Sequence, residues 1–490
     1  MSPEALGAAD REFLRMVADV VFANPFTGER MAEIRRLAPK ALATDREALA
    51  RVVAPKVAPF VRAGALARLA ADERLLLEPA LLYVTYHRYV PQLDAHIERQ
   101  AERSGEPLAA PFGEDAVREL VQMGFAEDRA ARFFAFFFQL RRAFYFIGRA
   151  LPGESDSMQR LRQALWNNMF THDMRGYEAV LYNRMEDFST LLLGETGTGK
   201  GSAAAAIGRS EFIPYLPRER RFAINFADSF IAINLSQFPE NLIESELFGH
   251  RKGAFTGAID HHQGIFERCN AHGALFLDEI GEVAIPVQIK LLQVLQERTF
   301  TPVGGRDKKR FSGRVIAATN QRLDALRREG RFRDDFFYRL CSDIIEVPTL
   351  RQRIAESPSE LEQLVRLLVA RVTGGEAPEL AALVIEALER CLPRSYPWPG
   401  NVRELEQAVR RVLLTGSYAA QSGGGTLSEE AALVAKLRAG TLGAEELLAR
   451  YCAMLHRRLG SYAEVARVTG LDPRTSRKYV ITGLGEERSE

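Results

Sequence analysis

The sequence predicts a multidomain protein with an all-α N-terminal domain, a central α/β domain with a helical lid, and a small all-α C-terminal domain. Three observations predict this fold class. Apolar residues recur at helical spacing in residues 1–160, five short β-rich runs alternate with helical stretches in residues 161–349, and helical patterning resumes from residue 350. With 490 residues and 47% hydrophobic content, the chain is long enough for about three or four packed domains.

The N-terminal domain shows its helical patterning most clearly at residues 65–90 and 131–151. The second segment contains the run FFAFFFQL, which is bounded by Arg132 and Arg141 and is far shorter than the ~20 residues of a membrane-spanning helix. We therefore expect a buried helix and no membrane contact. We interpret this part as a helical regulatory domain, for which the sequence identifies no ligand.

Bulk composition limits the function only loosely. Lys and Arg total 65 against 64 Asp and Glu, so any DNA contact must come from a local patch. The N-terminus has no basic segment followed by an apolar core, and the 4 cysteines include no Cys-x-x-Cys pair. Both features favour a reducing, cytoplasmic location.

The central domain contains five predicted strands, which imply a parallel sheet because helical stretches separate them. These strands begin near Ser189, Phe230, Ala274, Gly313 and Ser342.

The first predicted strand leads directly into GETGTGKG, which fits the G-x-x-x-x-G-K phosphate-binding loop. Main-chain N–H groups of such a loop can surround phosphates, and Lys200 can reach the outer ones. A glycine-rich turn that arises by chance is the alternative, but the position between a strand and a helix is the one that the motif requires. The candidate nucleotide-binding residues are Gly194, Glu195, Thr196, Gly197, Thr198, Gly199, Lys200, Gly201 and Ser202.

Two later strands end in polar residues that suit nucleotide hydrolysis. The run ALFLDEI ends with Asp278, which can hold Mg²⁺, and Glu279, which can orient or deprotonate the attacking water. A buried pair that only caps the next helix is the alternative. The run GRVIAATN ends with Asn320, which can sense the γ-phosphate or position water.

Three arginines further along the chain suit the stabilisation of phosphoryl charge. Arg333 and Arg339 lie in GRFRDDFFYRL, although surface arginines of this kind also form ordinary salt bridges. The segment WPGNVREL predicts a helix with Asn401 as its N-cap and Arg403 in its first turn. A cation there opposes the helix dipole unless a bound anion compensates.

The segment GHRKGAFTGAID, residues 249–260, places glycines on both sides of a bulky aromatic residue. It fits neither a strand nor a stable helix. Taken alone it reads as a flexible surface turn. The alternative is a mobile loop that binds a partner, since an exposed aromatic residue is otherwise a liability.

The order of these motifs resembles the central AAA+ P-loop ATPase domain of the sigma-54-dependent bacterial transcription activators, from about Gln163 to Thr415. The stretch ESELFGHRKGAFTGA is the most specific part of this resemblance. It implies a loop that rises in the ATP-bound state and pushes on sigma-54 in the RNA polymerase holoenzyme. The residues at the loop's tip are Gly253, Ala254, Phe255, Thr256, Gly257 and Ala258.

The resemblance also implies roles in ATP hydrolysis for the residues at the strand ends. Lys200 binds phosphate, Asp278 directs Mg²⁺, and Glu279 is the catalytic base. Asn234 is the switch residue that restrains Glu279.

The same resemblance assigns the three arginines. Arg333 and Arg339 reach the neighbouring subunit's site as arginine fingers, and Arg403 senses nucleotide from the lid. Fingers supplied in trans require a homo-oligomeric ring, normally a hexamer in this family.

The sequence departs from the family pattern at three places. Gly201 follows the phosphate lysine, where the family has an acidic residue and other phosphate loops have a magnesium-binding Ser or Thr, and Ser202 stands one position late. The segment 207–237 is longer than the usual connection to the second strand, and residues 350–361 are less acidic than usual. None of these departures removes a catalytic residue.

The tail SYAEVARVTGLDPRTSRKYV looks like a helix-turn-helix, with Asp472 as N-cap and Pro473 as the first residue of the second helix. A plain helical hairpin is the alternative. Family members end in such a module, so we expect double-stranded DNA at an upstream enhancer site as a partner. The expected DNA-binding residues are Arg474, Thr475, Arg477 and Lys478.

The sequence therefore predicts an ATP-dependent, DNA-bound activator that remodels sigma-54 RNA polymerase closed complexes. Two alternatives remain: a DNA-binding regulator with nucleotide-dependent assembly but little ATP turnover, and an AAA+ remodeller of a different client. The predicted divisions are a helical regulatory domain at 1–160, the α/β subdomain at 161–349, the helical lid at 350–418, a linker at 419–443, and the DNA-binding domain at 444–490.

Overall fold

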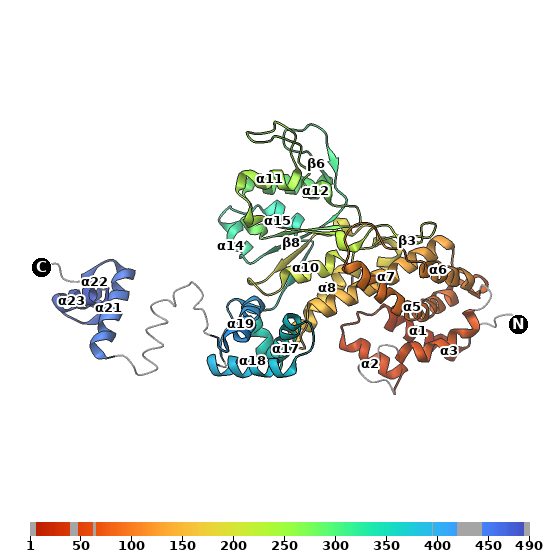
Figure 1. Cartoon of the computed structure of the whole chain (residues 1–490), viewed down its shortest axis with the longest axis horizontal. Helices are drawn as coiled ribbons and strands as arrows, with labels where there is room; N and C mark the ends of the chain where they lie inside the picture. The colour runs from red at the N-terminus through yellow and green to blue at the C-terminus, as the bar shows by residue number, and fades with distance from the viewer. Residues whose placement is uncertain (1–5, 40–47, 62–64, 394, 419–442, 485–490) are drawn as a thin grey trace. The chain divides into compact units, whose positions relative to one another are not determined.

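The computed structural model (Figure 1) describes residues 6–39, 48–61, 65–393, 395–418 and 443–484. The chain divides into two compact units. The first comprises residues 1–385 and 396–410, and the second comprises residues 386–395 and 411–490. The predicted linker, except for residue 443, lies outside the described residues.

The N-terminal part of the first unit is helical, as predicted. Its helices are α1 (Ala8–Phe22), α2 (Gly28–Leu37), α3 (Ala48–Val61), α4 (Ala65–Arg68), α5 (Ala71–Ala101), α6 (Phe112–Met123), α7 (Glu127–Ala150) and α8 (Asp156–Phe170). The phenylalanine-rich run lies in α7, where Phe134 and Phe138 are completely buried, so the prediction of a buried helix is confirmed. Among the described residues, no helix combines the length and apolarity needed to cross a bilayer.

The five predicted strands are all present and form one parallel sheet in the order β4-β5-β8-β1-β9. The strands are β1 (Thr190–Leu193), β4 (Phe230–Asn234), β5 (Ala274–Asp278), β8 (Arg314–Thr319) and β9 (Asp343–Glu346). Because all five run in the same direction, their carboxyl ends lie along one edge of the sheet. We call this the carboxyl edge, and the opposite one the amino edge.

Alternate side chains of each strand pack on opposite faces of the sheet. Leu191, Leu275 and Val315 face a core that includes α11 (Glu240–Phe248), α13 (Ile285–Glu297) and α15 (Asp334–Leu340). Leu192, Phe276 and Ile316 face the other core, which contains α10 (Lys200–Gly208), α7 and α8. The helical domain therefore shares one continuous hydrophobic core with the sheet (Figure 1). The predicted division at residue 160 falls inside α8.

The unusually long segment between α10 and β4 forms the hairpin β2 (Tyr215–Leu216) and β3 (Arg221–Phe222). This hairpin packs into the helical domain. The Phe222 ring stacks on that of Phe138 in α7, with centroids 3.8 Å apart. Tyr215 Oη donates to the main-chain oxygen of Ala110 at 3.1 Å, and the Ala110 N–H donates to the oxygen of Arg220 at 2.7 Å. The departure from the family pattern is thus the segment that docks the helical domain.

Residues after the sheet are helical, as predicted for a lid. The helices are α16 (Leu350–Glu356), α17 (Glu360–Thr373), α18 (Pro378–Cys391) and α19 (Asn401–Thr415). A buried ion pair joins Arg353 in α16 to Glu360 in α17 at 2.6 Å, and Arg353 also donates to the oxygen of Pro152. These contacts fix the lid's first turns to the chain segment that precedes α8.

The C-terminal residues form three helices, α21 (Ala444–Leu459), α22 (Tyr462–Thr469) and α23 (Pro473–Leu484). Cys452, Val465 and Val480 contribute one buried side chain from each helix to a small core. As predicted, Asp472 caps α23, because its carboxylate accepts from the N–H groups of Arg474 at 3.0 Å and Thr475 at 3.1 Å.

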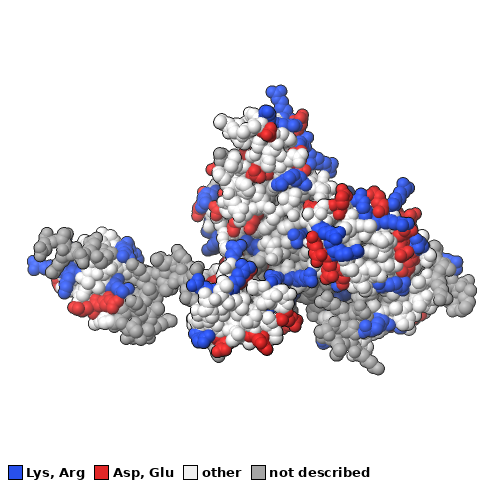
Figure 2. All heavy atoms as spheres, viewed as in Figure 1, with Lys and Arg blue, Asp and Glu red and all other residues white. Residues whose placement is uncertain are grey.

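On the face of the molecule seen in Figure 2, acidic and basic side chains are interspersed, in line with the net charge of +1 of the full sequence.

Candidate functional site

The phosphate-binding loop connects β1 to α10 at the carboxyl edge of the sheet. Lys200, the first residue of α10, is buried and directs its Nζ into the loop, where it donates to the main-chain oxygens of Gly194 at 2.8 Å and Glu195 at 3.2 Å. Burial lowers the pKa of Lys200, while the carboxylates of Glu279 and Asp278 act in the opposite direction. The loop thus holds a cation where phosphates bind in P-loop proteins.

The beginning of α19 lies directly against the tip of this loop. A Cβ atom at Gly197 would lie 2.2 Å from the oxygen of Gly400 and 3.0 Å from Cβ of Arg403, so only glycine fits there. The N–H of Arg403 is 3.4 Å from the oxygen of Gly197. The structure therefore places Arg403 beside the phosphate loop.

Asn401 does not cap its own helix, which corrects our expectation. Its side-chain N–H donates to the oxygen of Thr196 at 3.0 Å and to the Glu195 carboxylate at 3.2 Å. Its side-chain oxygen accepts from the N–H of Leu350 at 2.8 Å. Asn401 has a φ of 53°, a left-handed conformation that asparagine tolerates better than most residues. It joins the phosphate loop to the first turn of α16.

Sequence reasoning missed Arg351, which forms a second link between the loop and α16. Its guanidinium binds both carboxylate oxygens of Glu195, at 2.8 and 2.5 Å. This pairing lowers the pKa of Glu195. The only signal in the sequence was that residues 350–361 depart from the family pattern.

The predicted hydrolytic residues meet beside the loop at the ends of β5 and β8. Asp278 ends β5, and Glu279 follows it with a φ of 57°, a conformation that costs a non-glycine residue on the order of 1–3 kcal/mol. The Asn320 N–H lies 3.4 Å from the Glu279 carboxylate, and the Asn320 side chain donates to Thr196 Oγ1 at 2.8 Å. Asn320 thus links the phosphate loop to Glu279.

Asn234 ends β4 at the same edge of the sheet. It pairs in register with Asp278 on the neighbouring strand. Its side-chain oxygen accepts from the N–H of Ser236 at 3.0 Å and from the Ser236 hydroxyl at 2.7 Å. Within the described residues, no hydrogen bond joins Asn234 to Glu279.

The two candidate finger arginines lie at opposite ends of α15 and differ in their bonding. Arg339 donates from Nε at 3.0 Å and from Nη2 at 2.8 Å to the oxygen of Leu295 in α13. In the described part of the chain, the Arg333 side chain pairs only with the exposed carboxylate of Asp335, at 2.7 Å. Arg333 is therefore the arginine that this arrangement presents outward, whereas Arg339 is held within its own subunit.

A cavity of about 440 Å³ lies beside the phosphate loop. Gly194 and Glu195 form one side, residues 347–349 another, and Ser157 and Leu161 of α8 a third. The loop therefore opens into a space large enough for more than a phosphate group.

The loop that carries the hexapeptide is neither helical nor extended, as predicted. The Gly253 N–H donates to the oxygen of Ala258 at 2.8 Å, which closes the tip, and both Gly253 and Gly257 have positive φ values of 79° and 102°. Phe255 and Thr256 are exposed. The Phe255 ring lies beside that of His250, with ring centroids 4.9 Å apart.

Comparison with known proteins places this site in a family. Residues 171–346 match the model of the sigma-54 interaction domain. Over 293 residues the chain is 39% identical to the Nif-specific regulatory protein of Azotobacter vinelandii. The matched region covers 58% of this chain and 52% of that protein. It is 40% identical over 262 residues to the regulator NtrC of Azospirillum brasilense, and this match covers 54% of this chain and 47% of NtrC. The chain spans about half the length of these curated relatives.

Among solved structures, the NtrX protein of Brucella abortus in complex with ATP aligns with 75% of this chain and 80% of its own. The sequence identity is 24% and the TM-score is 0.40.

The parallel sheet, the phosphate loop and the acidic pair at the end of β5 define the central domain as an AAA+ P-loop ATPase domain. More particularly, residues 171–346 match the sigma-54 interaction domain, and over about half of its length the chain is similar to the two regulators named above.

Proposed function

We propose that this protein is a transcription activator that binds upstream DNA and uses ATP hydrolysis in an oligomeric ring to remodel sigma-54 RNA polymerase closed complexes. The observation that carries the proposal is the exposed pair Phe255 and Thr256, presented between two positive-φ glycines on a domain that carries a phosphate-binding loop and an acidic pair at the end of β5. An exposed aromatic residue on such a loop suits contact with a partner.

ATP fits the carboxyl edge of the sheet. Lys200 has to exchange its main-chain acceptors in the loop for phosphate oxygens. Glu279 is placed to polarise the attacking water, and Asn320 fixes its position relative to the phosphate loop. The cavity between α8 and residues 347–349 is the place where we expect the base.

Asp278 is the residue that we expect to hold Mg²⁺. Among the described residues, no three or more His, Cys, Asp or Glu side chains are grouped to bind a metal ion. The remaining ligands would therefore come from phosphates, water and the hydroxyl of Ser202, which takes over from the missing residue at Gly201. The ion's contribution when bound is to neutralise phosphate charge.

A ring brings an arginine from one subunit to the nucleotide of the next. We assign this role to Arg333, because its only side-chain partner in the described residues is the exposed Asp335. An arginine supplied in this way stabilises charge on the transferring phosphoryl group. Arg339 would instead keep α15 attached to the end of α13.

The C-terminal helices are proposed as the DNA-binding module. Arg474, Arg477 and Lys478 are exposed on α23, whereas Ser476 and Val480 of the same helix are buried. A helix with one buried face and one basic face suits insertion beside the phosphates of a duplex.

The experiment that tests the function measures binding of purified sigma-54 in the presence of ADP or of ADP–aluminium fluoride, a transition-state mimic. We expect a complex with the mimic only, and its loss in Thr256→Ala. Thr373→Ala, the same change at an exposed threonine at the end of α17, is the matched control. Turnover of ATP without any complex would indicate a different client, and nucleotide binding without turnover would indicate a regulator whose ATPase has decayed.

A further inference from the structure

A second cavity, of about 590 Å³, lies at the amino edge of the sheet, on the side opposite the nucleotide site. Its walls come from α7 of the helical domain, from residues 182–186 before β1, and from residues 211–215 of the long insertion. The turns at 271–273 and 312–314, which precede β5 and β8, complete it. Its size falls within the range of about 300–1,000 Å³ that is usual for small-molecule sites.

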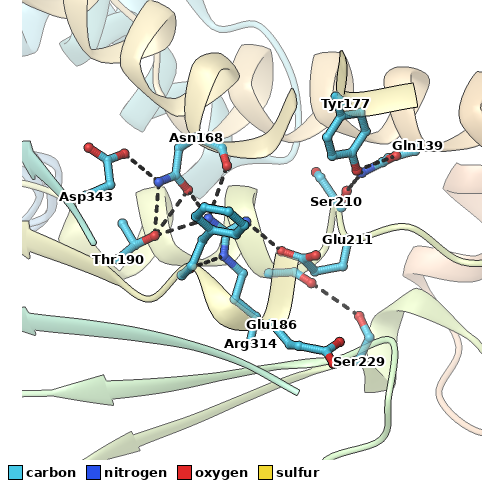
Figure 3. A network of polar contacts seen from close by, with 12 residues as sticks. Gln139, Asn168, Tyr177, Glu186, Thr190, Ser210, Glu211, Ser229, Arg314 and Asp343 are labelled. Atoms are coloured by element: carbon cyan, nitrogen blue, oxygen red, sulfur yellow. Dashed lines mark hydrogen bonds and ion pairs between the residues drawn. The ribbon is translucent and has the colours of Figure 1, made fainter. Parts of the chain in front are cut away.

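One wall of this cavity is fixed by a fully bonded arginine (Figure 3). Arg314 is 2% exposed, and its Nη1 lies 3.0 Å from the Glu211 carboxylate. Its Nη2 donates to the Asn168 side chain at 2.8 Å and to Thr190 at 3.2 Å, and its Nε donates to the oxygen of Phe188 at 3.0 Å. The charge of Arg314 is therefore balanced, and the wall is rigid without a ligand.

The other arginine of the cavity is also paired. Arg132 donates from Nη2 to the Glu178 carboxylate at 3.3 Å, and its guanidinium lies 5.4 Å from the centroid of the Tyr182 ring. Its buried Nε has no hydrogen-bond partner among the described residues. One donor of Arg132 thus remains for an acceptor atom of a ligand.

Two carboxylates that line the cavity have neither a hydrogen-bond partner nor an ion-pair partner in the described part of the chain. Glu186 and Asp128 line it, and within the described part of the chain no hydrogen bond or ion pair involves either carboxylate. The nearby Arg298 donates to the main-chain oxygen of Glu186 rather than to its carboxylate. Partial burial raises the pKa of Glu186, as expected for a carboxylate without a bonded cation.

The remaining walls are aromatic and apolar. The rings of Tyr182 and Phe212 meet edge to face with centroids 4.9 Å apart. Tyr215, Met185 and Pro214 also line the cavity, together with the polar residues Asn183 and Ser312. His272 also lines the cavity, but burial lowers its pKa, so it is neutral at pH 7 and does not supply a positive charge. Aromatic faces beside unpaired carboxylates favour an organic cation.

We propose that this cavity binds a small organic cation, namely a protonated amine or guanidine on an apolar or aromatic body, and that its occupancy alters ATP turnover. The two turns that line it lead directly into β5 and β8. These strands end beside Glu279 and Asn320, roughly 15–20 Å away at about 3.3 Å per residue. A ligand at the amino edge would thus touch the helical domain, the turn that leads into β5 and the first residue of β8. The coupling to turnover rests on the proposed ATPase function, whereas the binding does not.

The test measures the charge preference of the cavity directly. Ser312→Cys places a thiol in its lining with little change in side-chain size, and Ala131→Cys places one on α7 as an independent second variant. Each nucleotide-free protein is treated with methanethiosulfonate reagents that carry either a trimethylammonium or a sulfonate group. Modification is read peptide by peptide, with the native exposed Cys391 as the internal reference. Burial raises the pKa of the nearby Cys269 to about 12, so that thiol stays unreactive.

We expect the cationic reagent to be favoured over the anionic one by at least tenfold at the new cysteine, relative to the same ratio at Cys391. Glu186→Gln should reduce that preference at least threefold and leave Cys391 unchanged. A ratio equal to that at Cys391 in both cysteine variants, or no modification by either reagent, would overturn the binding site.

The same modified proteins test the coupling. We expect the cationic adduct at residue 312 to change the ATP turnover rate at least threefold, while modification of the parent protein at Cys391 changes nothing. Unchanged turnover, despite the charge preference, would overturn the link to the ATPase and leave the binding site standing. If the parent protein does not hydrolyse ATP, the proposed function fails and the reagent preference still decides the binding site.

Discussion

The two edges of the five-stranded sheet are both rich in polar side chains, but those side chains are bonded in opposite ways. At the carboxyl edge, Lys200 donates hydrogen bonds to main-chain oxygens, and Glu279 is held in a left-handed conformation. At the amino edge, Arg314 is buried and engages Glu211, Asn168 and Thr190 at once.

This difference separates groups that can exchange partners from groups that cannot. A lysine bonded to carbonyl oxygens can change to phosphate oxygens with little rearrangement, and strain of the kind seen at Glu279 is typical of functional sites. A buried arginine in an ion pair cannot lose its partner without leaving a charge uncompensated. We therefore expect mutation of the hydrolytic residues at the carboxyl edge to affect turnover and mutation of the paired Arg314 at the amino edge to affect folding.

The largest expected effect is the loss of turnover in Glu279→Gln. Removing a general base lowers the rate by about 10²- to 10⁴-fold, whereas nucleotide affinity and thermal stability should stay near those of the parent. Phosphate release, measured beside nucleotide binding, gives the answer. Glu282→Gln is the matched control, because this glutamate is exposed and lies one short turn further along the chain. Equal turnover in Glu279→Gln and the parent would remove Glu279 from the catalytic role.

The next largest effect should come from Arg314→Met at the amino edge. It leaves Glu211 buried without its cation, which costs about 3–5 kcal/mol of unfolding free energy. Urea denaturation of the nucleotide-free protein measures this loss. The double variant Arg314→Met with Glu211→Met should recover much of it, because the stranded charge is gone. Arg328→Met, at an exposed site on α14 (Leu323–Arg328), should change stability by less than about 0.5 kcal/mol. If Arg314→Met changes the unfolding free energy as little as Arg328→Met does, the pairing of Arg314 with Glu211 does not stabilise the fold.

The sequence predicted the carboxyl edge well because its signals are local. All five strands, the phosphate loop and the positions of Asp278 and Asn320 follow from short patterns of apolar, glycine and acidic residues. Each of these patterns lies within about ten residues, so no knowledge of the tertiary fold is needed to recognise it.

The sequence did not predict the amino edge because its contacts are distant along the chain. Arg314 and Glu211 are 103 positions apart, and nothing in either neighbourhood marks them as partners. The same reason hid Arg351, which reaches Glu195 over 156 positions. Asn401 was recognised as a special residue, but the local pattern suggested a helix cap, whereas the tertiary fold uses it to bridge Thr196 and Leu350. Long-range polar pairs are the part of this fold that only the structure reveals.

The smallest expected effect concerns the pH dependence of stability where the helical domain meets the insertion. His96 in α5 is completely buried, packs with its ring centroid 5.6 Å from those of Phe138 and Phe222, and has no hydrogen-bond partner for either ring nitrogen among the described residues. Burial lowers its pKa to about 4. As the pH falls below about 6.5, the unfolded chain binds a proton at this residue and the native state does not. Stability is therefore lost as the pH falls from about 6.5 towards 4.

We expect His96→Phe to remove this residue's share of the loss, at most about 1.4 kcal/mol per pH unit. Unfolding free energies measured between pH 6.5 and 5 should fall less steeply than in the parent. Some slope should remain, because burial also lowers the pKa of His87 to about 4. Thr85→Val is the control, since Thr85 is likewise buried on α5 with an unpartnered hydroxyl but does not titrate. It should shift the whole curve without changing its slope. An unchanged slope in His96→Phe would show that the native state binds the proton at His96 without loss of stability. Polar groups at this junction would then exchange partners, as those at the carboxyl edge are expected to do.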